Sequence, residues 1–334
     1  MIDLHLHLDG SLSIEDFRYL ASRNNIPLPS EFPNNIYVPE GCKSLEEYLL
    51  RFDLPCSLMQ DEYSLAYVAY SLVNRLAKNS YIYAEIRFAP QLHTLKGMSQ
   101  RDTVISAISG VNKALKDNPG MNANLILCCM RQADLKTNME TIELGAEFKG
   151  NRVVAVDLAG PEAFKTGDKY VALFNRAKEL GLNITIHAGE ACGSDEVIRA
   201  IDLLHAQRIG HGVHLELNMA NIKKMQEKKI AFEFCPTSNI NTTSISDYEH
   251  CPIREFDRVG ICVTVNSDNM TVSNTDVLKE FRYLYKAFKL QQHEVRHFLS
   301  NAIDAAFISV NEKAALLKRL ADNIDAYYQK IIEE

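Results

Sequence analysis

The chain has 334 residues, 46% of them hydrophobic, so it can bury a large core as one barrel or as two ordinary domains. Its 36 basic and 43 acidic residues give a net charge of -7, which disfavours nucleic acid or an anionic membrane as the main partner. A small-molecule ligand is therefore expected. No apolar run reaches membrane length and a strand begins at residue 2, which predicts a cytoplasmic protein.

Short β-branched or apolar segments recur along the chain, with helix-like segments between them. The eight strands expected on this basis span residues 2–8, 81–88, 124–130, 153–158, 183–187, 208–211, 230–235 and 261–266. Eight alternating strand and helix units predict an α/β fold, a (β/α)8 TIM barrel. An open doubly wound sheet is the weaker alternative, because no GxGxxG follows any of these strands. We expect residues 1–334 to form a single domain.

Helices are predicted where a simple repeat of strand and helix would not place them. The interval between the first two strands is long for a βα loop and contains helix-like stretches at 13–23, 44–53 and 61–78. Ser44 with Glu47 predicts a capping box before the second stretch, and Ser13 with Asp16 a weaker one before the first. Residues 275–330 predict a helical C-terminal extension.

The first strand has an unusual polar face. In HLHLDG and the residues before it, alternation places Asp3, His5, His7 and Asp9 on one side of the strand and the leucines on the other. For a single His-x-His the simpler interpretation is a solvated strand face, and the alternative is half of a metal site. Two ligands cannot hold a catalytic ion, so the choice depends on the rest of the chain.

Further ligand-type residues occur at other strand ends, which meet at the catalytic face of a TIM barrel. Closure brings the last strand beside the first, so Asp268 is expected next to His5 and His7, and the fifth strand adds His187. Three imidazoles and one carboxylate suit one zinc ion, with iron or cobalt as alternatives. Such an ion acidifies a bound water, which provides hydroxide near neutral pH.

Two further residues are candidates for catalysis, and a second metal is not expected. The fourth strand, VVAVDLAG, offers no bridging lysine, which favours one ion over two. Glu190 follows His187 by three residues and can carry protons without being a ligand, unless it is simply a carboxylate at a helix N-terminus. His211 can orient or deprotonate the water, although a single histidine at a strand end is often structural.

Taken together, the motifs resemble those of the adenosine deaminase family over nearly the whole chain. They are HLHLDGSL, ILCCMR, DLAGPE, HAGE, RIGHG, CPTSN and an SD pair after the last strand. The residues that the resemblance assigns to the metal are His5, His7, His187 and Asp268. It also implies that Glu190 protonates N1 of the purine and that His211 assists the attack of hydroxide on C6.

The resemblance also implies substrate contacts. Gly160 would present its backbone amide to N3 of the base, and Asp9 would accept a hydrogen bond from the ribose 5'-hydroxyl. Asn269 stands where the family often has a second aspartate, and an asparagine can make a comparable bond to N7. His7 is expected to border the substrate as well as the metal.

The segment SLEEYLLRFDLPCSLM resembles the helical gate of the family. On this basis Leu49, Phe52 and Leu58 are expected to cover the ribose, with Met130 nearby. The alternative is that they are ordinary residues of an amphipathic helix.

The expected reaction is hydrolytic deamination of adenosine, and of 2'-deoxyadenosine, to inosine and ammonia by a metal-activated hydroxide. The partner would be a small purine nucleoside, with no nucleic acid or membrane involved. One alternative is deamination of free adenine or of a modified adenine nucleoside, and another is a non-catalytic barrel that binds nucleosides. Asp9 favours a nucleoside, and its negative charge disfavours a mononucleotide.

Overall fold

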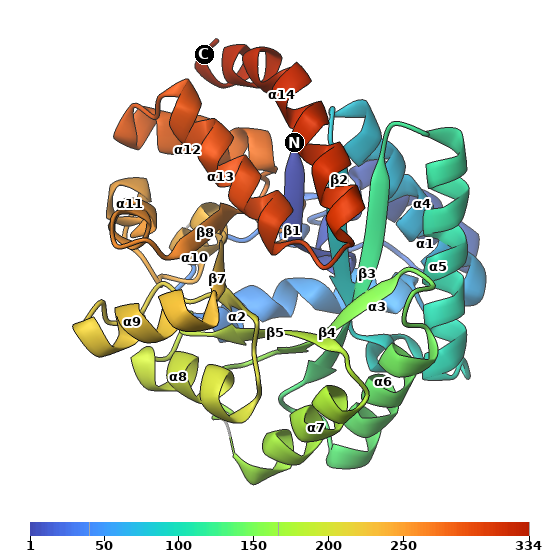
Figure 1. The fold of residues 1–334 in the computed structure, drawn as a ribbon. Coiled ribbons are helices and arrows are strands. Elements are labelled where there is room, and N and C mark those ends of the chain that lie inside the picture. The colour runs from blue at the N-terminus through green and yellow to red at the C-terminus, as the bar shows by residue number, and fades with distance from the viewer. Residues whose placement is uncertain (40, 166, 334) are drawn as a thin grey trace.

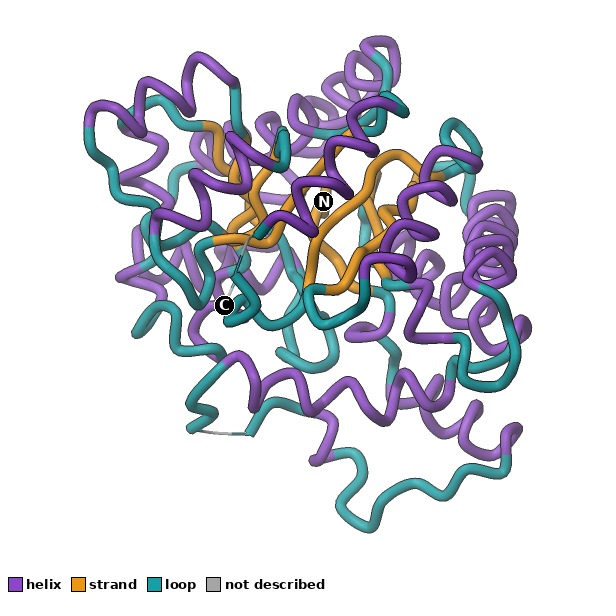
Figure 2. Tube along the Cα trace, turned by 90° about the horizontal axis from the view of Figure 1, so that it is seen from below, coloured by secondary structure: helices purple, strands orange, loops and turns teal. Residues whose placement is uncertain are grey.

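The computed structural model describes residues 1–39, 41–165 and 167–333. Eight parallel strands follow one another in chain order around a barrel, with helices outside them (Figures 1 and 2). The strands are β1 (Ile2–His7), β2 (Tyr83–Phe88), β3 (Asn122–Met130), β4 (Val153–Ala159), β5 (Asn183–Ala188), β6 (Arg208–His211), β7 (Ala231–Phe234) and β8 (Cys262–Val265). The prediction of a (β/α)8 barrel is confirmed, and all eight expected strands are present.

Closure of the barrel takes place just beyond the end of β8. A parallel bridge joins Leu6 to Asp268, the amide of His7 donates to the Asp268 carbonyl at 2.7 Å, and the amide of Asp268 donates to the His5 carbonyl at 2.8 Å. The backbone thus fixes Asp268 directly beside the two histidines of β1, as barrel closure predicts.

The two faces of β1 have different environments, as the alternation in its sequence predicts. Leu4, Leu6 and Leu8 are fully buried and belong to the main hydrophobic core. His5 is also fully buried, but its ring bonds to Glu233 of β7 across the barrel interior. The polar face of the first strand is therefore not solvated; it lines the inside of the barrel.

Helices cover the barrel and extend the chain beyond it. They are α1 (Ile14–Asn24), α2 (Leu45–Leu49), α3 (Asp53–Leu58), α4 (Glu62–Lys78), α5 (Gln100–Asp117), α6 (Leu135–Glu147), α7 (Asp168–Glu179), α8 (Ser194–Leu203), α9 (Met219–Lys228), α10 (Pro236–Asn241), α11 (Ile253–Arg258), α12 (Val277–Phe288), α13 (Gln292–Ala305) and α14 (Val310–Ile332). Of the stretches predicted between the first two strands, 13–23 corresponds to α1 and 61–78 to α4. The stretch at 44–53 forms α2 followed by a 3-10 turn at Leu50–Phe52, and the short helix α3 after it was not expected. None of the described helices is both long and apolar enough to cross a membrane.

The two predicted capping boxes differ from expectation. At α1 both halves form, since Ser13 accepts from the amide of Asp16 and the Asp16 carboxylate accepts from the amide of Ser13. At α2 the Ser44 side chain accepts from the Glu47 amide, but the Glu47 carboxylate accepts from Lys43. The Ser44 box is therefore only half formed, and the one expected to be weaker is complete.

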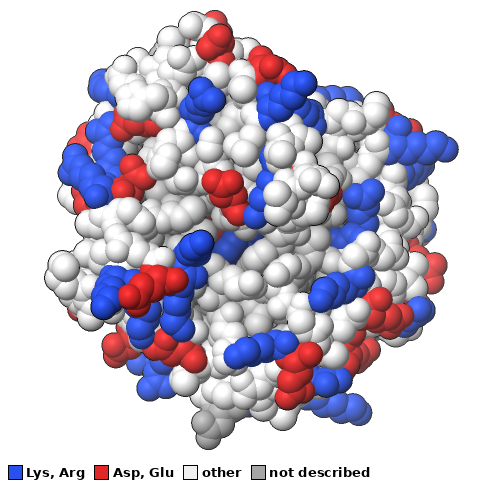
Figure 3. Space-filling model, in the orientation of Figure 1, with Lys and Arg blue, Asp and Glu red and all other residues white. Residues whose placement is uncertain are grey.

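The predicted C-terminal extension consists of α12, α13 and α14, which lie together at the top of Figure 1. The two ends of the chain meet at Ser80, whose carbonyl accepts from the N-terminal amine of Met1 at 2.7 Å and from the Tyr327 hydroxyl at 2.8 Å. α13 packs against β8 and β1. On the face shown in Figure 3, basic side chains are interspersed with acidic ones.

Candidate active site

A cavity of ≈470 Å³ lies at the C-terminal ends of the strands, where a TIM barrel carries its catalytic groups. Its polar lining includes His7, His187 and Asp268. His7 Nε2 lies 3.2 Å from His187 Nε2 and 3.4 Å from the Asp268 carboxylate, which also lies 3.5 Å from His5 Nε2. The structure thus brings together all four residues that the sequence predicts as metal ligands.

The donor atoms of this group fit a metal ion. Nδ1 of His5 bonds to Glu233 at 2.8 Å, and Nδ1 of His187 bonds to Asp157 at 2.9 Å. Because each carboxylate accepts the Nδ1 proton, it leaves the lone pair of Nε2 free for a metal ion. Nε2 of His5 is buried and has no hydrogen-bond partner among the described residues. Three imidazole nitrogens and one carboxylate oxygen are a donor set typical of zinc.

Two buried carboxylates and an arginine orient these histidines. Arg87 donates to Asp157 at 2.9 Å and to Glu233 at 2.7 Å, and all three side chains are inaccessible to solvent. Burial alone would raise the pKa of Glu233, but Arg87 and Arg208 outweigh it and hold that pKa well below its usual range. These supporting residues were missed from the sequence. The sequence feature that could have revealed them is a charged residue within an otherwise apolar strand. Arg87 lies in YIYAEIRF, Asp157 in VVAVDL and Glu233 in IAFEFC.

Glu190 and His211 lie together on the same cavity. The Glu190 carboxylate is 3.7 Å from His211 Nε2 and accepts from the Thr242 hydroxyl at 3.1 Å. Burial, followed by the charges of Asp268 and Glu162, raises the pKa of Glu190 well above its usual value, so its protonated form is favoured. Burial lowers the pKa of His211, so its ring is neutral at neutral pH. The site therefore contains a carboxylic acid that can donate a proton.

Asp9 lines the same cavity, and one of its carboxylate oxygens has no hydrogen-bond partner among the described residues. It lies in a 3-10 turn directly after β1, and Cys56 of α3 donates weakly to its Oδ2 at 3.8 Å. Oδ1 is buried without a hydrogen-bond partner among the residues described. Burial raises the pKa of Asp9 to about 6, so the carboxylate is mainly ionised at neutral pH. A ligand hydroxyl would supply the missing donor.

Gly160 and Asn269 also line the cavity. Gly160 has φ +97°, and a Cβ there would lie 2.5 Å from Gln132 Oε1, so a side chain at this position would be strained and crowded. Asn269 Oδ1 would lie 1.9 Å from a Cβ on Gly10, so the glycine of HLHLDG makes room for Asn269. Oδ1 of Asn269 is buried without a hydrogen-bond partner among the described residues and can only accept, so any hydrogen bond that Asn269 donates to a ligand must come from its NH2 group.

Three of the four residues expected at the gate lie on the cavity. Leu49, Phe52 and Met130 line the cavity. Leu58 does not, because it is fully buried in the hydrophobic core. The expectation for Leu58 is wrong because its side chain, near the end of α3, packs into the hydrophobic core and does not line the cavity.

The charged groups that line the cavity are mainly acidic. Its ionisable side chains other than histidine, cysteine and tyrosine are four carboxylates, from Asp9, Asp53, Glu190 and Asp268. Among the described residues that line it there is no lysine or arginine. The cavity therefore offers no fixed cation to a phosphate group.

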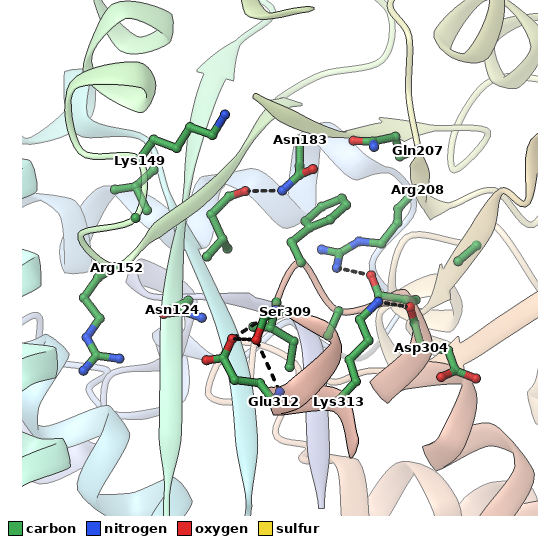
Figure 4. Close-up of a pocket in the computed structure, with 18 of the residues that line it drawn as sticks. Asn124, Lys149, Arg152, Asn183, Gln207, Arg208, Asp304, Ser309, Glu312 and Lys313 are labelled. Carbon is green, nitrogen blue, oxygen red and sulfur yellow. Dashed lines mark hydrogen bonds between the residues drawn. The ribbon is translucent and has the colours of Figure 1, made fainter. Parts of the chain in front are cut away.

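A larger cavity of ≈860 Å³ opens at the opposite end of the barrel, beside the connection between α13 and α14 (Figure 4). Its polar groups mostly bond to the protein itself, as Lys149 does to the Gly181 carbonyl and Lys313 to the Asp304 carbonyl. Within the described part of the chain, groups of three potential metal ligands occur only around the histidines of the first cavity. The chemistry is therefore assigned to the smaller cavity.

Comparison with known proteins agrees with this geometry. A family model described as adenosine deaminase matches residues 1–323. An adenosine deaminase of Clostridium botulinum (strain Hall) is 41% identical over 329 residues, which cover 97% of this chain and 98% of that protein. The crystal structure of an adenine deaminase from Arthrobacter aurescens has a TM-score of 0.89 at 25% identity, covering 97% of this chain and 98% of that one. A structure described as the ADAL–IMP complex has a TM-score of 0.84 at 25% identity and covers 97% of both chains. The chain belongs to the adenosine deaminase family.

Proposed function

We propose that this enzyme hydrolyses adenosine, and 2'-deoxyadenosine, to inosine and ammonia in the cavity at the C-terminal end of the barrel. The observation that carries the proposal is the convergence of three imidazoles and one carboxylate opposite Glu190, a buried carboxylic acid with a raised pKa. We also propose that residues 1–334 act as one domain, since α13 packs on the first and last strands of the barrel.

One metal ion belongs to this proposal. His5, His7, His187 and Asp268 would hold it, and their donor set favours zinc, with iron or cobalt as alternatives. When bound, such an ion supplies the Lewis acidity that makes water a nucleophile near neutral pH.

The chain's own residues account for the proton transfers. Glu190 donates its proton to N1 of the purine, which makes C6 electrophilic, and the neutral ring of His211 lies beside it to orient or deprotonate the attacking water. A bond forms between C6 and the water oxygen, and the bond between C6 and the exocyclic nitrogen breaks. Of the two protons of the water, one leaves with that nitrogen as ammonia and the other returns to Glu190, which is then protonated again for the next turnover.

Three contacts would hold the nucleoside. The backbone amide of Gly160 is proposed to donate to N3 of the base, and the NH2 of Asn269 to N7, which can only accept. Asp9 would accept the 5'-hydroxyl through Oδ1, the atom that the protein leaves without a partner. His7 would border the substrate beside the metal.

The same features favour adenosine deamination over the alternative substrates and over a non-catalytic role. Free adenine would leave the buried Asp9 oxygen unpaired, which is unfavourable. A nucleotide phosphate would meet Asp9 and Asp53 and no cation among the described lining residues. A non-catalytic barrel is disfavoured because the ligand set, Glu190 and His211 are all present in one cavity.

The His187→Ala substitution should remove metal and activity together, because it deletes one of four donors and leaves the other three exposed to water. The check is elemental analysis of the folded protein alongside an assay of adenosine deamination. His250→Ala is a suitable control, since His250 is exposed and its ring bonds to Asp247, outside the cavity. A folded, inactive His187→Ala protein with a full equivalent of metal would contradict this ligand set.

The Glu190→Gln substitution keeps the shape of the side chain but removes the transferable proton. We expect turnover to fall by a factor of ~100 or more while KM changes little, because general acid catalysis acts in the transition state. Steady-state kinetics on adenosine provide the measurement. If turnover remained within a few-fold of the parent, another group would be the proton donor.

The Asp9→Ala substitution should weaken the binding of adenosine by about 1 to 3 kcal/mol, roughly 5- to 150-fold in KM, because the buried 5'-hydroxyl loses its acceptor. The loss should be much smaller for 5'-deoxyadenosine, which has no hydroxyl to bind. Parent and variant are compared on both substrates, so that general damage to the site cancels. Equal losses on the two substrates would remove Asp9 from the ribose contact.

A further inference from the structure

One carboxylate next to the active site has unusually many backbone partners. Glu162 lies in the loop after β4, two residues beyond Gly160, and is 3% exposed. Its two oxygens accept hydrogen bonds from four consecutive backbone amides. The donors are Gly189 at 2.5 Å, Glu190 at 3.1 Å, Ala191 at 2.6 Å and Cys192 at 2.7 Å.

These four amides belong to the turn that carries Glu190. The turn lies between the end of β5 and the start of α8, so its N–H groups have no strand or helix carbonyls to bond. Gly189 has φ +72°, and a Cβ there would lie 2.4 Å from Val197, so the chain reverses in a tight space. Consecutive amides that point inward form a concave site for an anion, and the Glu162 carboxylate fills it.

The loop that carries Glu162 is itself anchored to the metal site. Arg131, which is fully buried, donates from Nη1 to the Phe164 carbonyl and from Nη2 to the His187 carbonyl, each at 2.9 Å. The side-chain end of Glu190 is held separately by Thr242, the residue directly after α10. Thr242 thus holds the carboxyl group of Glu190, and Glu162 holds its backbone amide.

We propose that Glu162 is a positioning residue for catalysis, which holds the turn at residues 189–192 so that the Glu190 carboxyl group points at the purine ring. This inference rests on the proposed role of Glu190 as proton donor. The loop after β4 would then contribute to the site twice. Gly160 at its start borders the purine base, and Glu162 orients Glu190, which protonates that base.

Glu162→Ala tests the proposal, because the atoms it removes correspond to one molecule of acetate. We expect kcat for adenosine to fall about 10- to 100-fold with KM within about 3-fold, since a small misplacement of a catalytic group slows chemistry more than binding. Metal content should be unchanged. Added acetate should restore most of kcat with saturation, whereas propionate, which is one methylene too large, should restore little.

Two further variants serve as a comparison and a control. Glu162→Gln keeps one acceptor oxygen for three of the amides but turns an NH2 group toward the fourth, so its kcat should be intermediate and insensitive to acetate. Asp134→Ala removes an exposed carboxylate that accepts from the Thr137 amide at the start of α6 and does not line the cavity. Its kcat should match the parent with and without acetate.

Hydrogen exchange provides a readout that does not depend on activity. The amides of residues 189–192 should exchange faster in Glu162→Ala and should be protected again by acetate. Unchanged exchange, an undiminished kcat, or a joint loss of metal and kcat that acetate does not reverse would overturn the proposal. If the parent failed to deaminate adenosine, the proposed function would fall, while acetate-dependent protection would still identify Glu162 as the residue that holds the turn.

Discussion

The geometry of the site depends on the buried charge cluster at the centre of the barrel. Arg87 bonds to Asp157 and Glu233, and these carboxylates in turn fix the rings of His187 and His5. Removal of one member of a buried ion pair costs about 3–5 kcal/mol, because the remaining charge is left unpaired in a low dielectric. The cluster is therefore stable only as a complete set, and this makes the histidine nitrogens converge without relying on a flexible loop.

The convergence of the site residues was predictable because barrel topology converts chain order into spatial order. Alternation in HLHLDG places His5 and His7 on the inner face of β1, and closure places Asp268 beside them. His187 and Glu190 follow from the position of HAGE at the end of the fifth strand. These inferences need only the strand periodicity and the rule that catalytic groups lie at the C-terminal ends.

The supporting contacts required the three-dimensional register. Arg87, Asp157 and Glu233 lie on strands far apart in the sequence, and which of them meet depends on strand tilt and side-chain length. Two local features between β1 and β2 were equally hard to predict from the sequence. Leu58, near the end of α3, packs into the core, and the carboxylate of Glu47 bonds to Lys43 in place of completing the Ser44 cap. In each case several packing or hydrogen-bond partners are available, and the sequence pattern does not show which of them the side chain contacts.

If water replaces the amino group at C6 of an intact purine nucleoside, the oxygen atom of the product must come from the solvent. The purified enzyme is incubated with adenosine in water enriched in oxygen-18, and the products are analysed by mass spectrometry together with an ammonia assay. The account predicts inosine that carries one heavy oxygen in its base, with one ammonia released per inosine. Release of free adenine and ribose, or inosine without the label, would contradict it.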